Sequence, residues 1–281
     1  MADYLAERLP AVPREEWCRR LGVGEVLDET GQPVAPDAPF RGGQRLYYWR
    51  TLPHEERVPF EAQVLHLDEH LLVADKPHFL PVTPTGRFVR ETLLVRLKQA
   101  TGIDTLSPIH RIDRETAGLV LFSVRAQDRG AYQALFRERQ VDKTYEAIAP
   151  CPAEGASHHQ FPVVRRSRIE EDPSAFYRMI ETDGEANSET TIALAERRGG
   201  WARYALEPIT GKRHQLRVHM NGLGLPIAGD QFYPMVRRGP GEPEDYAAPL
   251  RLLARSIAFT DPVTGRPRRF ESRLALAWPG A

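Results

Sequence analysis

The stretch HRIDRETAGLVLFS, residues 110–123, joins a charged segment directly to an apolar one. Five of its first six side chains are ionisable, whereas Leu, Val, Leu and Phe follow at 119–122. A short apolar run with a β-branched and an aromatic member is typical of a buried strand. We therefore expect the charged half to be a loop that leads into a rigid strand.

Asp113 lies in the middle of this charged loop. If the loop is extended, Arg111 and Asp113 point to the same side, because side chains alternate with a period of two. Arg114 follows directly, and a nearby cation favours the ionised form of a carboxylate. An ionised, well-held aspartate suits a nucleophile or a general base better than a general acid. On charge pattern alone, a solvated turn with surface ion pairs is the alternative.

The same stretch closely resembles the HRLDRxTSGLLLFA signature of the RluA-type RNA pseudouridine synthases. It differs by Ile112 in place of Leu and by Ala117 in place of Ser. In that family the aspartate of the signature is the catalytic residue. The resemblance therefore implies that Asp113 is catalytic and that the solvated turn is the weaker interpretation.

Two further motifs extend the resemblance to about residues 64–235. VLHLDEHLLVADKP, residues 64–77, has two apolar runs that predict a hairpin, and it resembles the first motif of the family. Phe79 stands where that motif has Gly, so we expect the loop after Pro77 to be built differently. The third motif is PITGKRHQLRVHMNGLGLPIAGD, residues 208–230, in which the spacing predicts a helix over 212–221.

The resemblance assigns roles to particular residues of these motifs. Arg217 matches the arginine that pairs with the catalytic aspartate. Tyr145, in the predicted strand 142–150, matches the tyrosine of a K-x-Y motif that lies over the target base, although half-buried packing is the alternative on spacing alone. The expected catalytic residues are thus Asp113, Tyr145 and Arg217. The expected RNA-binding residues are His110, Arg111, Arg114, Lys143, Lys212 and Arg213.

The composition fits an ordinary soluble protein of 281 residues, with 41% hydrophobic and 27% charged residues. No apolar run approaches the ~20 residues of a membrane span, and the N-terminus lacks the layout of a signal peptide, so we expect a cytoplasmic protein. Cys18 and Cys151 have no spacing for a metal and are expected to be reduced thiols. Lys plus Arg and Asp plus Glu both number 38, so local basic patches rather than net charge must hold phosphates.

The chain is expected to have two domains. Residues 1–57 contain two short helical patterns followed by short apolar runs between Gly, Pro and Asp turns, which predicts a small α/β unit. This unit weakly resembles the alpha-L RNA-binding domain that often precedes the catalytic domain in this family; an unrelated extension is the alternative. For residues 58–281 the resemblance implies an α+β catalytic domain, with a long mixed, mainly antiparallel sheet, flanking helices and a central cleft.

The implied reaction converts uridine in structured RNA, either 23S ribosomal RNA or transfer RNA, to pseudouridine. The bond from N1 to C1′ breaks, the uracil rotates, and C5 bonds to C1′. No group enters or leaves, so neither a cofactor nor a metal is required. The target base must leave its stack to reach the enzyme. We expect a monomer.

Two alternative functions remain open at this point. One is an RNA-binding module without catalysis, which the joint presence of the three catalytic residues disfavours. The other is a metal-dependent hydrolase that uses His214, His219 and Asp113. Residues five apart do not share a helix face, and no nearby Cys or carboxylate completes a site, which disfavours metal binding.

Overall fold

The protein is described by a computed structural model that covers residues 1–10, 12–49, 55–152, 160–239 and 242–280. The chain divides into two compact units, Met1–His54 and Glu55–Ala281. The second unit begins earlier than the expected residue 58. The carboxylate of Glu55 explains this, because it accepts hydrogen bonds from the backbone N–H groups of residues 89–91. His54 lies outside the described residues.

The first unit contains two helices and a two-stranded antiparallel sheet, as the sequence predicts. These elements are α1 (Ala2–Arg8), α2 (Arg14–Gly22), β1 (Val26–Leu27) and β2 (Tyr47–Tyr48). Glu15 and Glu16 lie in the first turn of α2, where they complement the helix dipole. The core is small and centres on Trp17, which is fully buried.

The second unit is built on one 11-stranded sheet. Its order is β3-β4-β6-β12-β7-β11-β10-β8-β9, with β5 added to β6 and β13 added to β12. Only the β12–β6 pairing is parallel among the strands that the structure describes. The strands are β3 (Gln63–Leu67), β4 (Leu71–Lys76), β5 (Ser107–Pro108), β6 (Ala117–Ser123), β7 (Asp142–Pro150), β8 (Val163–Asp172), β9 (Ala175–Thr182), β10 (Ser188–Arg198), β11 (Trp201–Pro208), β12 (Leu252–Thr260) and β13 (Pro267–Glu271). The expected α+β architecture with a mixed, mainly antiparallel sheet is confirmed.

Strands β4 and β6 are buried along their whole length because helices cover both of their faces. Leu72 and Val120 point to the face covered by α3 (Leu93–Thr101). Their neighbours Leu71 and Leu119 point to the opposite face, covered by α4 (Arg129–Arg137). The uninterrupted apolar run in the motif at 110–123 is the sequence of such a doubly covered strand.

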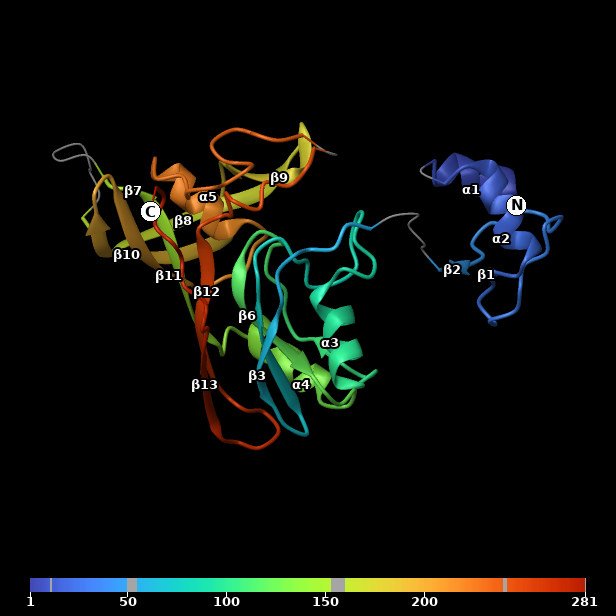
Figure 1. The fold of residues 1–281 in the computed structure, drawn as a ribbon, viewed down its shortest axis with the longest axis horizontal. Coiled ribbons are helices and arrows are strands. Elements are labelled where there is room, and N and C mark those ends of the chain that lie inside the picture. Colours follow the sequence, from blue (N-terminus) through green and yellow to red (C-terminus); the bar gives the residue numbers. More distant parts are fainter. Residues whose placement is uncertain (11, 50–54, 153–159, 240–241, 281) are drawn as a thin grey trace. The chain divides into compact units, whose positions relative to one another are not determined.

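Helix α5 (Gln215–Gly222) covers the other half of the sheet, where Met220 packs against Ala147 of β7. The strand registers place α5 on the same face as α3. Leu252 of β12 pairs with Ala147, on the face that α5 covers. The next residue of β12 pairs with Ala117, which lies two residues from Leu119 and therefore on the face covered by α4. In Figure 1, α5 lies near one end of β12, and α3 lies over a different part of the sheet. The middle of this face is thus left for the loop that precedes β6.

Gly118 allows β6 to lie beside β12 where the two strands pair in parallel. Its φ is +108°, and a Cβ at this position would lie 2.3 Å from the carbonyl oxygen of Ala254. Only glycine fits this close approach without moving the backbone. The glycine at the boundary between charged and apolar sequence therefore fixes where β6 enters the sheet.

The expectation that the loop after Pro77 differs from that of the family stays a prediction, but the conformation of Phe79 is clear. Phe79 has a φ of +66°, the left-handed conformation that glycine adopts without strain. The phenyl ring is buried and packs 6.0 Å from Phe60 and 5.1 Å from Tyr246, measured between ring centroids. Ring packing in the α3 core therefore offsets the backbone strain.

Candidate active site

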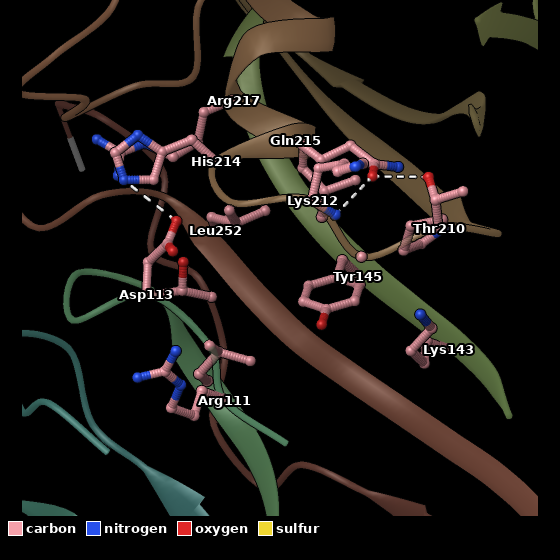
Figure 2. Close-up of a pocket in the computed structure, with 15 residues that line it drawn as sticks. Arg111, Asp113, Lys143, Tyr145, Thr210, Lys212, His214, Gln215, Arg217 and Leu252 are labelled. Carbon is pink, nitrogen blue, oxygen red and sulfur yellow. Dashed lines mark hydrogen bonds and ion pairs between the residues drawn. The ribbon is translucent and has the colours of Figure 1, made fainter. Parts of the chain in front are cut away.

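A pocket lies on the α3 and α5 face, between the loop before β6, the start of β7 and the segment before α5. All three expected catalytic residues line it. The polar residues of its wall are Arg111, Asp113, Thr116, Lys143, Tyr145, Thr210, Lys212, His214, Gln215 and Arg217. Figure 2 shows Asp113 and Arg217 facing each other across one end of this pocket.

The carboxylate of Asp113 lies 3.6 Å from the guanidinium of Arg217, measured from Oδ2 to Nη1. The side chain of Asp113 is 25% exposed, whereas that of Arg217 is fully buried. Within the described part of the chain, Nη1 of Arg217 is a buried donor with no hydrogen-bond partner. The guanidinium therefore presents an unused donor toward Asp113 and the interior of the pocket.

Asp230 holds Arg217 in this orientation. It accepts a hydrogen bond from Nε at 2.8 Å and another from Nη2 at 2.7 Å. The guanidinium also lies 4.9 Å from the ring centroid of Phe232. Burial would lower the pKa of Arg217, but the carboxylates of Asp230, Glu115 and Asp113 raise it, so the side chain stays charged. Asp230 ends the third motif, but no feature of the sequence predicts this role.

Glu115 is a third carboxylate beside Arg217, at 3.6 Å from Nη1. It is buried and forms an ion pair of 2.7 Å with Arg114. Burial would raise the pKa of Glu115, but the guanidinium groups of Arg114 and Arg217 lower it to about 2. Glu115 is thus ionised and shares Arg217 with the two aspartates, a role that the sequence analysis does not predict.

Tyr145 points into the pocket from β7, between Asp113 and Lys143 in Figure 2. Burial and the negative charge of Asp113 raise the pKa of Tyr145 above its ordinary value, so the hydroxyl stays protonated. Lys143 lies two residues away on the same face of the strand, as period two requires. Burial and the neighbouring Arg139 lower the pKa of Lys143.

Gln215 fixes the turn that carries Lys212. Its Oε1 accepts hydrogen bonds from the hydroxyl of Thr210 and the backbone N–H of Lys212, at 2.7 and 3.0 Å. Its Nε2 donates to the carbonyl of Glu189 in β10. Since 212–214 form this turn, helix α5 begins at Gln215, and the expected helix start at 212 is wrong.

Three of the six expected RNA-binding residues line the pocket: Arg111, Lys143 and Lys212. None of these three forms an ion pair with another described residue. Arg111 and Lys212 are exposed, and Lys143 is half-buried. Their positive charges are therefore free to contact an anionic ligand at the mouth of the pocket.

The other three do not line the pocket. His110 stacks on Phe136 and accepts a hydrogen bond from the backbone of β6, and burial lowers its pKa to about 3, so the ring is neutral. Arg114 is held by Glu115 and Glu244, and Arg213 by Glu171 and the carbonyl of Phe176. Each of these three side chains thus has partners within the protein, and a role of these residues in RNA binding stays a prediction.

The two histidines considered as metal ligands face different surroundings. His214 lies in the pocket wall with a φ of +54°, and its Nδ1 is 3.1 Å from the hydroxyl of Tyr233. His219 is buried and hydrogen-bonded to hydroxyls of Ser167, Ser188 and Thr190. Burial lowers the pKa of both histidines to about 4. In the described ranges no three His, Cys, Asp or Glu side chains form a group suited to a metal ion.

No helix in the described residues is long and apolar enough to cross a membrane. The described cysteines, Cys18 and Cys151, are free thiols, as expected.

Residues 70–222 match the family model described as RNA pseudouridylate synthase. An uncharacterized RNA pseudouridine synthase of Synechocystis sp. is 32% identical over 244 residues, which are 86% of this chain and 80% of that protein. The dual-specificity RNA pseudouridine synthase RluA of Salmonella typhi is 32% identical over 213 residues, which are 74% of this chain and 91% of that protein.

A solved structure agrees with these sequence matches. The human RNA pseudouridylate synthase domain containing 4 is 27% identical, with a TM-score of 0.57 over 75% of this chain and 88% of that chain. The span of the family model includes Asp113, Tyr145 and Arg217. The chain therefore belongs to the RluA-type RNA pseudouridine synthase family and is an isomerase that converts uridine in RNA to pseudouridine.

Proposed function

We propose that the pocket holds one uridine of a structured RNA, either 23S ribosomal RNA or transfer RNA, and that Asp113 is the catalytic residue. One observation carries the assignment: Asp113 faces a buried, charged Arg217 whose Nη1 has no hydrogen-bond partner in the described chain. Such a charge-assisted contact holds a carboxylate in a defined orientation. The resemblance of the motifs to a family that acts on these two RNA classes supports the choice of substrate.

In the proposed reaction, Asp113 acts as a nucleophile or base and promotes cleavage of the bond from N1 to C1′. The uracil rotates within the pocket, C5 bonds to C1′, C5 loses its proton, and N1 gains one. Asp113 would act by attack at C1′, by attack at C6 or by removal of the C2′ proton. The protonated Tyr145 stacks on the uracil. Because no group enters or leaves, these steps need no cofactor or metal.

Base flipping is part of the proposal. The pocket is recessed between a loop and a helix, where a base stacked in a duplex does not reach, and extrusion costs about a few kcal/mol. Arg111 is exposed at the pocket and has no ion-pair partner in the described chain. We assign it to the space left by the flipped base or to the neighbouring phosphate, while Lys143 and Lys212 bind further phosphates.

Mapping pseudouridines in total RNA tests the catalytic assignment. Cells with and without the protein would be compared by carbodiimide adduct formation and primer extension. We expect one or a few uridines of ribosomal or transfer RNA to lose the modification without the protein, and wild type but not Asp113→Asn to restore it. Asp104→Asn, at an exposed position outside the pocket, is the matched control and should restore the modification fully.

Binding measurements complete this test. Asp113→Asn should bind RNA about as well as wild type, because the carboxylate contributes nothing to phosphate binding. Turnover near the wild-type level in Asp113→Asn would reject the mechanism. An unchanged pseudouridine map of both RNA classes would reject the proposed substrates.

The role of Arg111 is tested by Arg111→Ala. Removal of one phosphate contact should weaken RNA binding and reduce the slope of log K against log salt by about 0.7 to 0.9. Arg137→Ala is the control and should bind RNA as wild type does, because Arg137 is exposed on α4, which covers the opposite face of the sheet. If Arg111→Ala keeps the wild-type affinity, salt slope and turnover, the assignment fails.

The two alternative functions give different results in the same assays. A metal-dependent hydrolase would lose activity in the presence of a chelator and regain it with added metal, whereas the proposed isomerase should turn over unchanged in the presence of a chelator. A module without catalysis would bind RNA but leave no pseudouridine. The monomeric state and the cytoplasmic location stay predictions from the sequence.

The first unit is proposed to add RNA-binding surface, as an alpha-L domain would. Tyr47 and Trp49 are 53% and 66% exposed, and the exposed Arg45 precedes them. Exposed aromatic side chains next to arginine suit the stacking of unpaired bases. Trp49→Ala should weaken RNA binding and leave the turnover of saturated enzyme unchanged; wild-type affinity in this variant would contradict the proposal.

A further inference from the structure

A second pocket of about 360 Å³ lies next to the candidate active site. Its wall comes from four regions that are far apart in the sequence: residues 87–88, 114–115, 176–177 and, in the last region, 231–239 with 242–244. Four aromatic rings line it: Phe88, Phe176, Tyr177 and Phe232. Three arginines and three glutamates line it as well: Arg87, Arg114, Arg238, Glu115, Glu242 and Glu244.

The two pockets share a wall. The ring of Phe232, in the second pocket, stacks on His214 at 5.6 Å and lies 4.9 Å from the guanidinium of Arg217, and these two residues line the first pocket. Glu115, which lines the second pocket, is two residues from Asp113. A nucleotide next to one held at Asp113 would therefore reach the second pocket directly.

Phe176 gives this pocket an open aromatic face. It is the second residue of β9, after the turn from β8, and it is 80% exposed, the largest exposure among the large apolar residues that the structure describes. Arg213 donates a hydrogen bond to the carbonyl of Phe176, which fixes the backbone there. The ring of Phe176 contacts that of Tyr177 edge to face, with 5.5 Å between the ring centroids. The centroid of Tyr177 is in turn 5.5 Å from that of Phe232. An exposed ring in a fixed position suits stacking by an unpaired base.

The arginines supply groups for the phosphate of such a nucleotide. Arg87, Arg114 and Arg238 all point to the carboxylate of Glu244, at 2.7, 2.9 and 3.7 Å. One nearly buried carboxylate thus orients three guanidinium groups. The side chain of Arg87 keeps 49% of its surface exposed, so its fork can also reach an oxygen of a phosphate.

We propose that this second pocket binds one unpaired nucleobase of the substrate RNA, adjacent to the target uridine, with the base stacked on Phe176 and its phosphate at Arg87. The inference rests on the proposed function, because flipping the target uridine leaves neighbouring nucleotides without their stacking partner. The pocket would then stabilise the opened RNA, and its preference among bases would contribute to the choice of uridine.

Fluorescence of 2-aminopurine tests the proposal on the full-length protein. The probe is a nine-nucleotide oligouridylate with 2-aminopurine at its centre, bound to the Asp113→Asn variant so that no turnover occurs. Stacking on an aromatic ring quenches this fluorophore. We expect quenching on binding, and in the additional variant Phe176→Ala we expect loss of quenching with about 5- to 100-fold weaker binding.

Two further variants separate stacking from a structural effect. Phe176→Tyr keeps an aromatic face and should restore both quenching and affinity. Val263→Ala removes another exposed apolar side chain, in the turn between β12 and β13, and should behave as the parent does. Equal affinity and equal quenching in Phe176→Ala and its parent would overturn the proposal. The two proposals can fail separately. If Asp113→Asn is catalytically active but quenching still requires Phe176, only the catalytic assignment is rejected.

Discussion

Arg217 connects the catalytic carboxylate to the rest of the protein. Asp230 occupies its Nε and Nη2, while Nη1 faces both Asp113 and Glu115 at 3.6 Å. A buried guanidinium without such partners would be strongly unfavourable. The position of the reactive aspartate therefore depends on a carboxylate that does not itself line the pocket.

We predict that Asp230→Asn lowers kcat at least tenfold with little change in the affinity for RNA. The amide retains part of the hydrogen bonding but not the charge, so Arg217 turns toward Asp113 and Glu115. Removal of one partner of a buried ion pair also destabilises the fold by about 3 kcal/mol. Single-turnover kinetics and urea denaturation measure the two effects.

Asp261→Asn separates the loss of activity from the loss of stability. Asp261 is also fully buried and binds Arg268 and Tyr132, in a part of the sheet away from the pocket. Its replacement should cost a similar free energy of unfolding and leave kcat unchanged. Equal kcat in Asp230→Asn and Asp261→Asn would show that Asp230 has only a structural role.

Phe79 allows backbone strain and core packing to be compared at one residue. Phe79→Gly removes the strain of a φ of +66°, worth about 1 kcal/mol, but it also removes a buried ring, worth about 3 to 5 kcal/mol. We predict a net destabilisation of about 2 to 4 kcal/mol in urea denaturation. A variant as stable as wild type would mean that the backbone strain is as large as the packing contribution and would contradict the prediction.

At the scale of elements, the sequence predicts best where one pattern acts alone. The hairpin of β3 and β4 and the buried strand β6 follow from their apolar runs. Helix α5 begins later than its side-chain spacing predicts, because Gln215 holds residues 212–214 in a turn by contacts with β10. Such contacts between distant segments leave no periodic signal in the sequence.

The candidate site shows the same division. Motifs bring Asp113, Tyr145 and Arg217 to attention, and the structure places them around one pocket. The sequence does not separate the unpaired Arg111 from Arg114, because the partner of Arg114 at Glu244 is 130 residues away. The functions of these residues stay proposals, but the difference in their surroundings is a property of the fold.

Gly118 offers a prediction about the junction of two elements. In Gly118→Ala the added Cβ would meet the backbone of Ala254, and φ would remain in a region that alanine rarely adopts. We predict a loss of about 2 to 4 kcal/mol in the free energy of unfolding. Gly130→Ala is the control, because a Cβ there meets nothing within 4 Å and alanine favours the helix. Equal stability of the two variants would contradict this account.

For the whole molecule, the buried histidines predict how stability depends on pH. Burial lowers the pKa of His78, His214 and His219 to about 4 and that of His110 to about 3, from an ordinary value of 6.5. Below pH 6.5 the unfolded chain binds protons that the folded chain does not, so stability is complete above pH 6.5 and is lost as the pH falls toward 4. Each histidine contributes up to about 1.4 kcal/mol per pH unit in this window.

Urea denaturation at several pH values measures this loss. The urea concentration at the midpoint of unfolding should decrease as the pH is lowered from 6.5 to 4.5. His110→Phe keeps the stack on Phe136 and should make this decrease with pH less steep. All four histidines belong to the second unit, so a separate transition of the first unit would not share this dependence. A midpoint that is constant from pH 6.5 to 4.5 would contradict the prediction.

The position of β12 has a consequence for synthesis on the ribosome. This strand is translated long after β6 and β7, yet it lies in the sheet between them. Until residue 260 has left the exit tunnel, both of these strands keep an unpaired edge, which invites association with other chains. Asp113 precedes β6 and Tyr145 lies on β7. In the nascent chain these two strands are not yet connected through β12 in one sheet, so the two residues are not yet held in one pocket. The active site can therefore assemble only after β12 has left the exit tunnel.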